Sequence, residues 1–392
     1  MSEQVDYYKI LSDNGIPTTQ EALETAWADE VAAQGSAISN DNAYSPFWRV
    51  VTALITKPVL WLIAFIAETV LPNSFVKSAI GIWLELLAWA VNLERKLARK
   101  ARGKITFLRA DINAAYTVPA GTVIQTASIN GIVYELITDV ATAFQAGQAT
   151  VAVDCTAADV GDAYNLAVGY YSILKEPIAG ITSVTNAEGW LTQPGTDNET
   201  DDDLRDRVRN QFGTASDFHT DSVYRALISQ FPGVAIDAIW FEHNAPRGPG
   251  TANAFVLFDF DAPASQYLID INNYITDQGH HGHGDDLQVY AMPETAHALT
   301  ANIWHEPFLT DAQIAVLTAD VDDFIRAAFR ENKAYGPTLT YPHSRFSFSK
   351  LAQELHKQFP DIHSVEFDLA DIVSALNVPT LTSLTINMAV TE

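Results

Sequence analysis

Closely spaced glycine and proline residues divide residues 109–209 into short segments. These segments are rich in Val, Ile, Thr and Tyr, a composition typical of β-strands joined by tight turns. Within residues 118–122, Pro119 fixes one φ angle and Gly121 tolerates a positive φ, a combination that predicts a turn. The stretch therefore predicts a series of short strands, and residues 200–209 predict the helix that ends it.

Taken together, the order and spacing of these residues resemble the core signature of the baseplate J family. Members of that family are wedge components of the baseplates of contractile phage tails and related injection particles. The resemblance implies a structural protein without catalytic residues or cofactors. The residues that carry it are Arg109, Val118, Pro119, Ala120, Gly121, Thr122, Gly161, Asn165, Pro177, Gly180, Asn186, Asp197, Glu199, Asp201, Arg205 and Arg207.

The resemblance also implies the partners and the location of the protein. Wedge proteins form a ring around the central hub, and rearranged contacts between wedges release contraction of the sheath. The expected partners are other copies of the chain (in the ring or as a dimer within each wedge), a helical wedge partner, a small lysozyme-like wedge protein, and sheath-proximal and hub proteins. Neither nucleic acid nor a membrane is expected as a partner. The protein would be made in the host cytoplasm and belong to the virion tail baseplate.

Composition limits the alternatives. The chain has 392 residues, of which 48% are hydrophobic and 18% charged, which indicates a globular protein. Its net charge of -25 argues against a nucleic-acid-binding body, because phosphate binding needs a basic face. The single cysteine, Cys155, excludes an internal disulfide and alternates with Val151 and Val153, so we expect it in the core. No signal peptide is visible at the N-terminus.

Residues 1–104 predict a helical region that binds a partner. Residues 74–102 carry two apolar stripes at helical spacing, which predicts one long helix with too much apolar surface for the short helices before it to cover. Other chains would then complete the bundle, and a closed intrachain bundle is the alternative. The candidate partner-binding residues are Trp61, Ile80, Trp83, Leu84, Leu86, Leu87, Trp89, Val91, Leu93 and Leu97.

An apolar run at residues 59–67 raises a membrane-active alternative that would use residues 58–91. A spanning helix needs about 20 apolar residues. We expect Pro58 to begin a new helix that stops near Pro72, which leaves the apolar run too short to span a membrane. A buried bundle helix is the favoured interpretation.

The predicted long helix ends in a basic run that consists of Arg95, Lys96, Arg99, Lys100, Arg102 and Lys104. Cations at a helix C-terminus are favoured by the helix dipole, which explains part of the run. The run is also consistent with a docking patch for an acidic partner or an acidic neighbouring subunit.

Overall, the sequence predicts an α+β multidomain protein: an N-terminal helical bundle segment, a small β-rich domain and two α+β units. The expected boundaries are 1–104, 105–180, 181–295 and 296–392, with the last unit making contacts between subunits. Expected strands of the β-rich part lie at 105–110, 123–127, 132–138, 150–155 and 171–174. Similar helix–Phe-Pro–strand segments around residues 227–234 and 355–362 suggest a duplication.

Two clusters of polar residues could carry chemistry. The acidic residues 201–203 are followed by Arg205 and Arg207, and we interpret them as a capped helix start, with an acidic catalytic or metal site as the alternative. His280, His281, His283 and Asp285 lie within six residues and define a metal-binding or hydrolase alternative. Glycines separate these histidines, so a solvated turn is favoured. The chain lacks Gly-x-Ser-x-Gly, His-Glu-x-x-His and Gly-rich phosphate-loop motifs.

Overall fold

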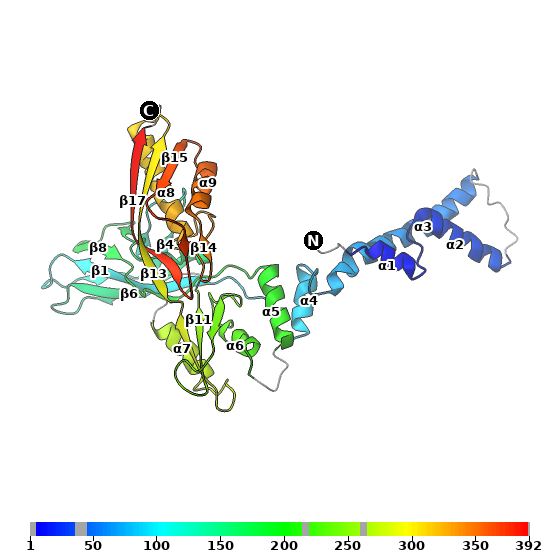
Figure 1. The fold of residues 1–392 in the computed structure, drawn as a ribbon, viewed down its shortest axis with the longest axis horizontal. Helices are drawn as coiled ribbons and strands as arrows, with labels where there is room; N and C mark the ends of the chain where they lie inside the picture. Colours follow the sequence, from blue (N-terminus) through cyan, green and yellow to red (C-terminus); the bar gives the residue numbers. More distant parts are fainter. Residues whose placement is uncertain (1–4, 36–44, 214–218, 259–264, 391–392) are drawn as a thin grey trace. The chain divides into compact units, whose positions relative to one another are not determined.

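The computed structural model describes residues 5–35, 45–213, 219–258 and 265–390, shown as a ribbon in Figure 1. The chain forms two compact units, one of Met1–Arg95 with Thr200–Arg209 and one of Lys96–Glu199 with Asn210–Glu392. Helices and several separate sheets make up these units, so the predicted α+β multidomain class is confirmed.

The first unit is helical. Its helices are α1 (Tyr7–Asp13), α2 (Gln20–Ala33), α3 (Pro46–Phe65), a π-helical turn η1 (Ile66–Val70), a 3-10 turn η2 (Pro72–Ser74), α4 (Ile82–Trp89) and the first part of α5 (Asp201–Gly213). Leu11 of α1 packs with Ile63 and Ala67, and these side chains form one small core of the unit. A second small core lies between α4 and α5.

Pro58 lies inside α3, so the prediction that one helix stops at Lys57 and another begins at Pro58 is wrong. An internal proline removes one backbone hydrogen bond and costs about 3 kcal/mol, and here the helix continues through it. Helical turns then extend to Ser74. The segment Thr52–Asn73 is therefore long and apolar enough to cross a membrane by length and composition, contrary to the count made from the sequence.

The predicted helix over residues 74–102 is also wrong, because α4 contains only 8 residues. The helix ends at Trp89, and Asn92, three residues further on, has a φ of 58°. The amide of Leu93 donates to the carbonyl of Ala88 (2.9 Å) and that of Asn92 to Trp89 (3.0 Å), the pattern of a Schellman cap. The basic run consequently lies at and before the start of a β-strand, and the helix-dipole explanation for it fails.

The second unit begins with a seven-stranded sheet in the order β7-β3-β4-β6-β1-β8, with β9 also paired to β1. The strands are β1 (Lys100–Arg109), β3 (Val123–Gln125), β4 (Glu135–Thr138), β6 (Thr150–Val160), β7 (Ile173–Leu174), β8 (Ile181–Thr185) and β9 (Leu191–Gln193), and β2 (Thr117–Val118) pairs separately with β5 (Thr142–Ala143). These strands confirm the predicted ones. Alternate side chains of β1, including Ile105 and Phe107, fill the core of this nearly closed barrel. Cys155 lies in that core, and its burial raises the pKa of the thiol to about 12.

A three-stranded sheet follows, in the order β10-β11-β12. Its elements are α6 (Asp221–Ile228), β10 (Ile239–Glu242), β11 (Thr251–Val256), α7 (Ser265–Ile275) and β12 (Asp286–Ala291). The apolar side of this part, including Ile228 and Ile271, belongs to the same core as the barrel. The barrel and this part therefore bury one continuous apolar interior.

The last part has its own core beneath a sheet in the order β15-β13-β17. Its elements are β13 (Glu294–His305), α8 (Asp311–Ala328), β14 (Arg345–Phe346), α9 (Phe348–Gln358), β15 (Ile362–Phe367), β16 (Ile372–Val373) and β17 (Val378–Val390). In Figure 1, β15, β13 and β17 lie side by side, with β17 (red) outermost. The repeated helix–Phe-Pro–strand element is present at α6–β10 and α9–β15. The other connections differ, because β10 pairs with the next strand β11 and β15 with the earlier strand β13.

Candidate interaction surface

Helix α4 buries one face and exposes the other. Leu84 and Ala88, four residues apart on α4, pack against Leu204 and Val208 of α5, and all are completely buried. The opposite face of α4 carries Ile82, Leu86 and Trp89, which are all more than half exposed. A helix that is apolar on both faces but covered on only one leaves apolar surface in water.

Polar contacts fix α4 to α5. The carboxylate of Asp201 accepts hydrogen bonds from the amide of Gly81 (2.9 Å) and from Arg95 Nη2 (2.6 Å). Arg95 Nε also lies 2.7 Å from Glu85 Oε1. The amide of Gly81, together with the Arg95 guanidinium, lowers the pKa of Asp201 below its usual value. These contacts hold the start of α5 against the start of α4.

The arginines of the same motif element also contact backbone carbonyls. Arg205 donates to the carbonyls of Val76 (3.0 Å) and Ala79 (2.9 Å), and Arg207 donates to the carbonyl of Glu94 (3.3 Å). Thr200 accepts a hydrogen bond from the amide of Asp203 (3.2 Å), as an N-terminal cap does. The interpretation of this element as a capped, structural helix start is confirmed.

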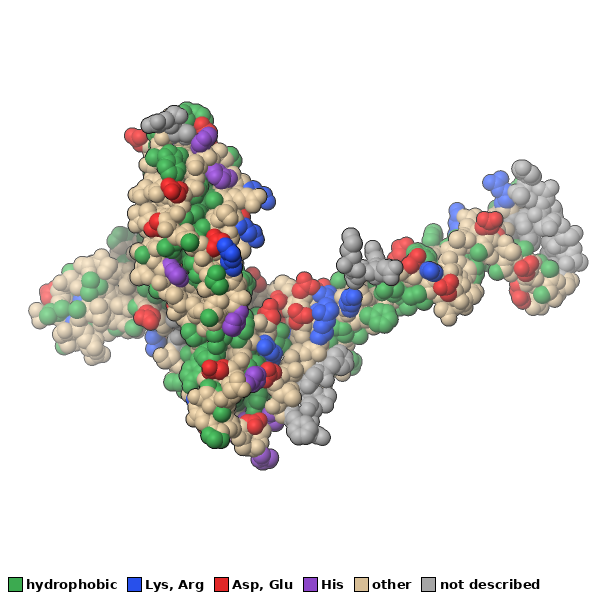
Figure 2. Space-filling view, viewed as in Figure 1, with side chains coloured by type: hydrophobic (Ala, Val, Ile, Leu, Met, Phe, Trp, Pro, Cys, Tyr) green, Lys and Arg blue, Asp and Glu red, His purple; other side chains and the backbone are tan. Residues whose placement is uncertain are grey.

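Helix α3 adds to the exposed apolar surface. Leu54, Trp61, Leu62 and Phe65 are each more than half exposed, and Trp61 reaches 73%. We define the apolar surface of the first unit as these four side chains of α3 and the three of α4, namely Ile82, Leu86 and Trp89. Figure 2 shows apolar side chains, in green, along these helices. Apolar exposure of this extent is typical of a surface that contacts another molecule.

The structure separates the predicted partner-binding residues into three groups. Trp61, Ile80, Leu86, Trp89 and Leu97 are exposed; Trp83, Leu87, Val91 and Leu93 are half-buried; and Leu84 is buried inside the unit. Leu97 belongs to the second unit, where it precedes β1. Leu54, Leu62 and Phe65 were not predicted, although their spacing with Trp61 is helical. Leu54 joins this spacing only because α3 continues through Pro58.

In the barrel, Arg109 of the family motif is a buried structural residue. Its guanidinium donates to the carbonyls of Ala114 (2.8 Å), Ile112 (2.6 Å) and Gln145 (3.0 Å). The guanidinium carbon also lies 5.1 Å from the centre of the Phe144 ring. Arg109 therefore holds loops of the barrel together.

Residues 118–122 form the predicted turn. The carbonyl of Pro119 accepts hydrogen bonds from the hydroxyls of Thr122 (2.9 Å) and Thr138 (2.7 Å). Gly121 has a φ of 79°, which a glycine adopts without strain. Val118 is buried, and Ala120 is exposed. The prediction of a turn at this position is confirmed.

Two buried amides close other loops of the barrel. Asn165 Nδ2 donates to the carbonyl of Gly195 (2.8 Å), and Asn186 Oδ1 accepts from the amide of Tyr171 (3.0 Å). At Gly180, an added Cβ would lie 1.9 Å from the ring of Tyr116. Among the remaining motif residues, Gly161 lies beside Asp197. Glu199 accepts a hydrogen bond from the amide of Lys96, and Pro177 is exposed.

The histidine-rich loop does not gather its side chains around one point. His280 stacks on Tyr274, and its Nδ1 contacts the carbonyl of the same residue (2.8 Å). His281 Nδ1 contacts the carbonyl of Gly282 (2.9 Å), and Asp285 accepts from the hydroxyl of Tyr224 (3.0 Å). His283 is exposed. Within the described parts of the chain, no cluster of three or more His, Cys, Asp or Glu side chains could hold a metal ion.

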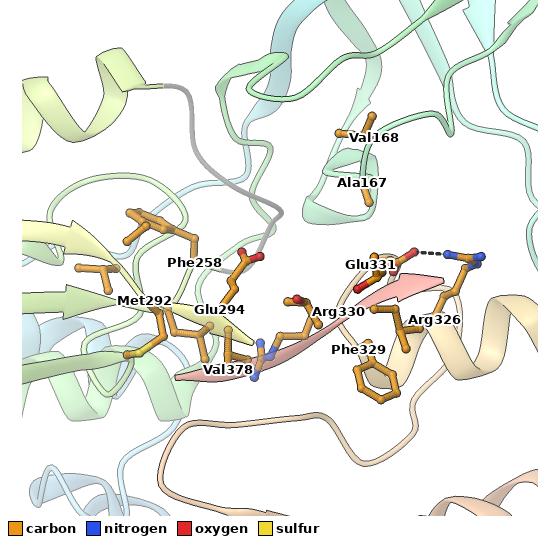
Figure 3. A pocket seen from close by; sticks show the side chains of 16 residues that line it. Ala167, Val168, Phe258, Met292, Glu294, Arg326, Phe329, Arg330, Glu331 and Val378 are labelled. Atoms are coloured by element: carbon orange, nitrogen blue, oxygen red, sulfur yellow. Dashed lines mark hydrogen bonds and ion pairs between the residues drawn. The ribbon is translucent and has the colours of Figure 1, made fainter. Parts of the chain in front are cut away.

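A cavity of about 380 Å³ lies within the second unit, shown in Figure 3. Its charged lining residues are Glu294, Arg326, Arg330 and Glu331, and Arg326 forms an ion pair with Glu331 (2.8 Å). Apolar side chains such as Met292 and Phe329 form much of the remaining wall. None of the described lining residues is Ser, Cys or His.

Residues 104–193, most of the barrel, match the family model of the baseplate J-like protein barrel domain. The putative baseplate protein gp29 of Haemophilus phage HP1 is 43% identical over 344 residues, which cover 87% of each chain. The chain belongs to the baseplate J family. It is a baseplate protein and a part of the virion tail. A chain in the cryo-EM structure of the anti-feeding prophage baseplate (6-fold symmetrised) is similar over 91% of this chain and 90% of that chain, at 12% identity. Its TM-score of 0.36 does not establish a common arrangement of domains.

Proposed function

We propose that this baseplate protein is a wedge component whose N-terminal helices bind a helical partner protein. The apolar surface of α3 and α4 carries the proposal. Trp61 and Trp89 are large aromatic side chains exposed by 73% and 72%, and such side chains dominate the binding energy of protein interfaces. A partner helix laid on this surface would remove it from water.

A protein partner explains this surface better than a membrane does. The hydroxyl of Tyr8 donates to Glu68 Oε1 (2.6 Å), and Leu11 packs on Ile63 and Ala67. Insertion of Thr52–Asn73 into a bilayer would require α1 to leave this position and would place Glu68 in the hydrocarbon. The chain is part of the virion tail, which also supports a protein partner rather than a membrane.

The rest of the proposal concerns the assembled particle. Copies of the chain form a ring around the hub or dimers within each wedge, with the last part of the chain, residues 296–392, contacting other copies. The small lysozyme-like, sheath-proximal and hub proteins are the further partners. Changed contacts between wedges would then release contraction, as interfaces that exchange between two arrangements can do. The role is structural rather than catalytic.

Co-expression with the neighbouring baseplate genes tests the helical partner. A Trp61→Glu/Trp89→Glu double variant places charges on the apolar surface, and we expect it to lose the partner in affinity purification. The matched control is Phe308→Glu, because Phe308 is exposed by 74% in the second unit. Retention of the partner by the double variant, or loss of it by both variants, would contradict the proposal. Recovery of the wild-type chain with vesicles in a flotation assay would favour the membrane alternative.

A further inference from the structure

Strand β17 forms one edge of the sheet β15-β13-β17 and is 13 residues long. Within the described residues, its strand partner is β13 alone, paired in parallel from Val378 to Val390. The backbone amides and carbonyls on its other side therefore pair with no strand of the described residues. The opposite edge of the same sheet is β15, which has only 6 residues.

The composition of this edge is unusual for a chain with 48 acidic and 23 basic residues. Residues 378–390 contain no Asp, Glu, Lys, Arg or His. Edge strands of monomeric proteins are commonly protected by charged side chains, prolines or short length, and β17 has only Pro379, near its start. By contrast, β15 carries His363 and Glu366.

The inner face of β17 fixes the strand in place. Leu384, Ile386 and Met388 pack against the core that α8 and α9 cover. The alternate side chains, Thr385, Asn387 and Ala389, are exposed on the open face of the sheet. A strand held on one face, with an unpaired and uncharged edge, is already in the conformation that strand addition requires.

We propose that β17 pairs in antiparallel fashion with β17 of a second copy of this chain, across a two-fold axis. Pairing would join two three-stranded sheets into one continuous sheet. The argument for a second copy is electrostatic. Each chain carries a net charge of -25, so two copies meet with least repulsion where neither has a charged side chain. A two-fold interface also requires a segment that complements itself, and a strand without charges opposes no like charges when paired with its own copy.

This inference rests on the proposed function only in taking contacts between copies as part of the assembly. It specifies which element makes one of those contacts. The binding of the helical partner involves the other unit of the chain, so each proposal can fail without the other.

Sedimentation equilibrium of the purified full chain tests the pairing. We expect the wild-type chain to dimerise and a Thr385→Lys/Ala389→Lys variant to dimerise at least about tenfold more weakly, because lysines on an edge strand oppose strand addition. Both positions are exposed, so the fold should be retained, as an unchanged thermal unfolding midpoint would verify. The control is Ser364→Lys, on the same row across the sheet as Ala389 but in the opposite edge strand β15. It should leave the dimer constant unchanged.

Hydrogen exchange of the wild-type chain gives the second readout. Amides of residues 381–390 should exchange more slowly as the protein concentration rises through the dimer constant. Three results would overturn the pairing. The wild-type chain could stay monomeric, the β17 variant and the Ser364 variant could dimerise equally weakly, or the slower exchange could be confined to other elements. The Thr385→Lys/Ala389→Lys variant should still co-purify with the helical partner, which separates this result from the test of the N-terminal surface.

Discussion

The barrel and the N-terminal helices differ in which side chains they bury. In the barrel, the motif residues Arg109, Asn165 and Asn186 are buried and make several hydrogen bonds each to loop backbone. In the N-terminal unit, Trp61 and Trp89 are exposed although tryptophan has the largest apolar side chain of any residue type. These three polar side chains of the barrel bind loops of the same chain. The helices of the first unit leave apolar surface exposed, so the barrel residues of the family motif and the proposed binding surface lie in different parts of the protein.

The largest loss of stability is expected when a buried polar side chain of the barrel is removed. Asn186→Ala removes the acceptor for the amide of Tyr171 and the donor to the carbonyl of Ala167 (2.8 Å). Two buried backbone groups would lose their partner, which we expect to cost about 3 kcal/mol of unfolding free energy. Urea denaturation followed by circular dichroism measures it. Asn113→Ala, at an exposed asparagine next to the barrel, should cost little. Equal losses in the two variants would show that burial of Asn186 is not the cause.

A smaller loss is expected from the core between α4 and α5. Leu84 is completely buried there, and Leu84→Ala should cost about 2 kcal/mol through the cavity left behind. The loss should appear as local opening, measured by faster hydrogen exchange in α4 and α5 while the barrel amides keep their protection. Faster exchange throughout the barrel would mean that the two regions do not unfold independently.

Asp323, a partly buried residue of α8, adds a pH dependence to the stability. Burial, with the neighbouring Asp322, raises the pKa of Asp323 to about 6. The folded chain then holds this proton at pH values where the unfolded chain has released it, so stability should fall as the pH rises from about 4 to about 6. Asp323 is partly exposed, and solvent screening reduces the expected contribution to about 1 kcal/mol. Asp323→Asn should flatten this part of the profile of melting temperature against pH. An unaltered slope would assign the dependence to other groups.

The smallest effect on stability is expected on the apolar surface itself. Trp89→Ser removes an exposed side chain and should change the unfolding free energy by less than about 0.5 kcal/mol. The measurement is the same exchange experiment as for Leu84→Ala. A large loss would place Trp89 in an intrachain core and remove it from the proposed interface.

Local chemistry explains which predictions succeeded. The turn at residues 118–122 depends on the φ preferences of proline and glycine, which act over a few residues and can be recognised in the sequence. The strands of the barrel follow from alternation between such turns. The capped start of α5 at Thr200 is likewise a local hydrogen bond. Each of these features is decided within about five residues.

The two failed predictions both concern where a helix ends. The apolar stripes of residues 74–102 predicted a long helix, but Asn92 in the left-handed region ended it. Pro58 predicted a helix boundary, but α3 continues through it. In the first case a single cap outweighed a periodic pattern, and in the second the helix tolerated a residue that usually breaks it.

By itself, the sequence determined the family, the strands and turns of the barrel, and the presence of excess apolar surface near the N-terminus. Only the tertiary structure decided which apolar side chains are buried. Leu84 and Leu86 have the same residue type two positions apart, yet α5 covers one and leaves the other exposed. It also decided that β17 lies at a sheet edge. The physical reason is that burial and strand order depend on contacts between residues far apart in the chain, whereas turns and caps depend on near neighbours.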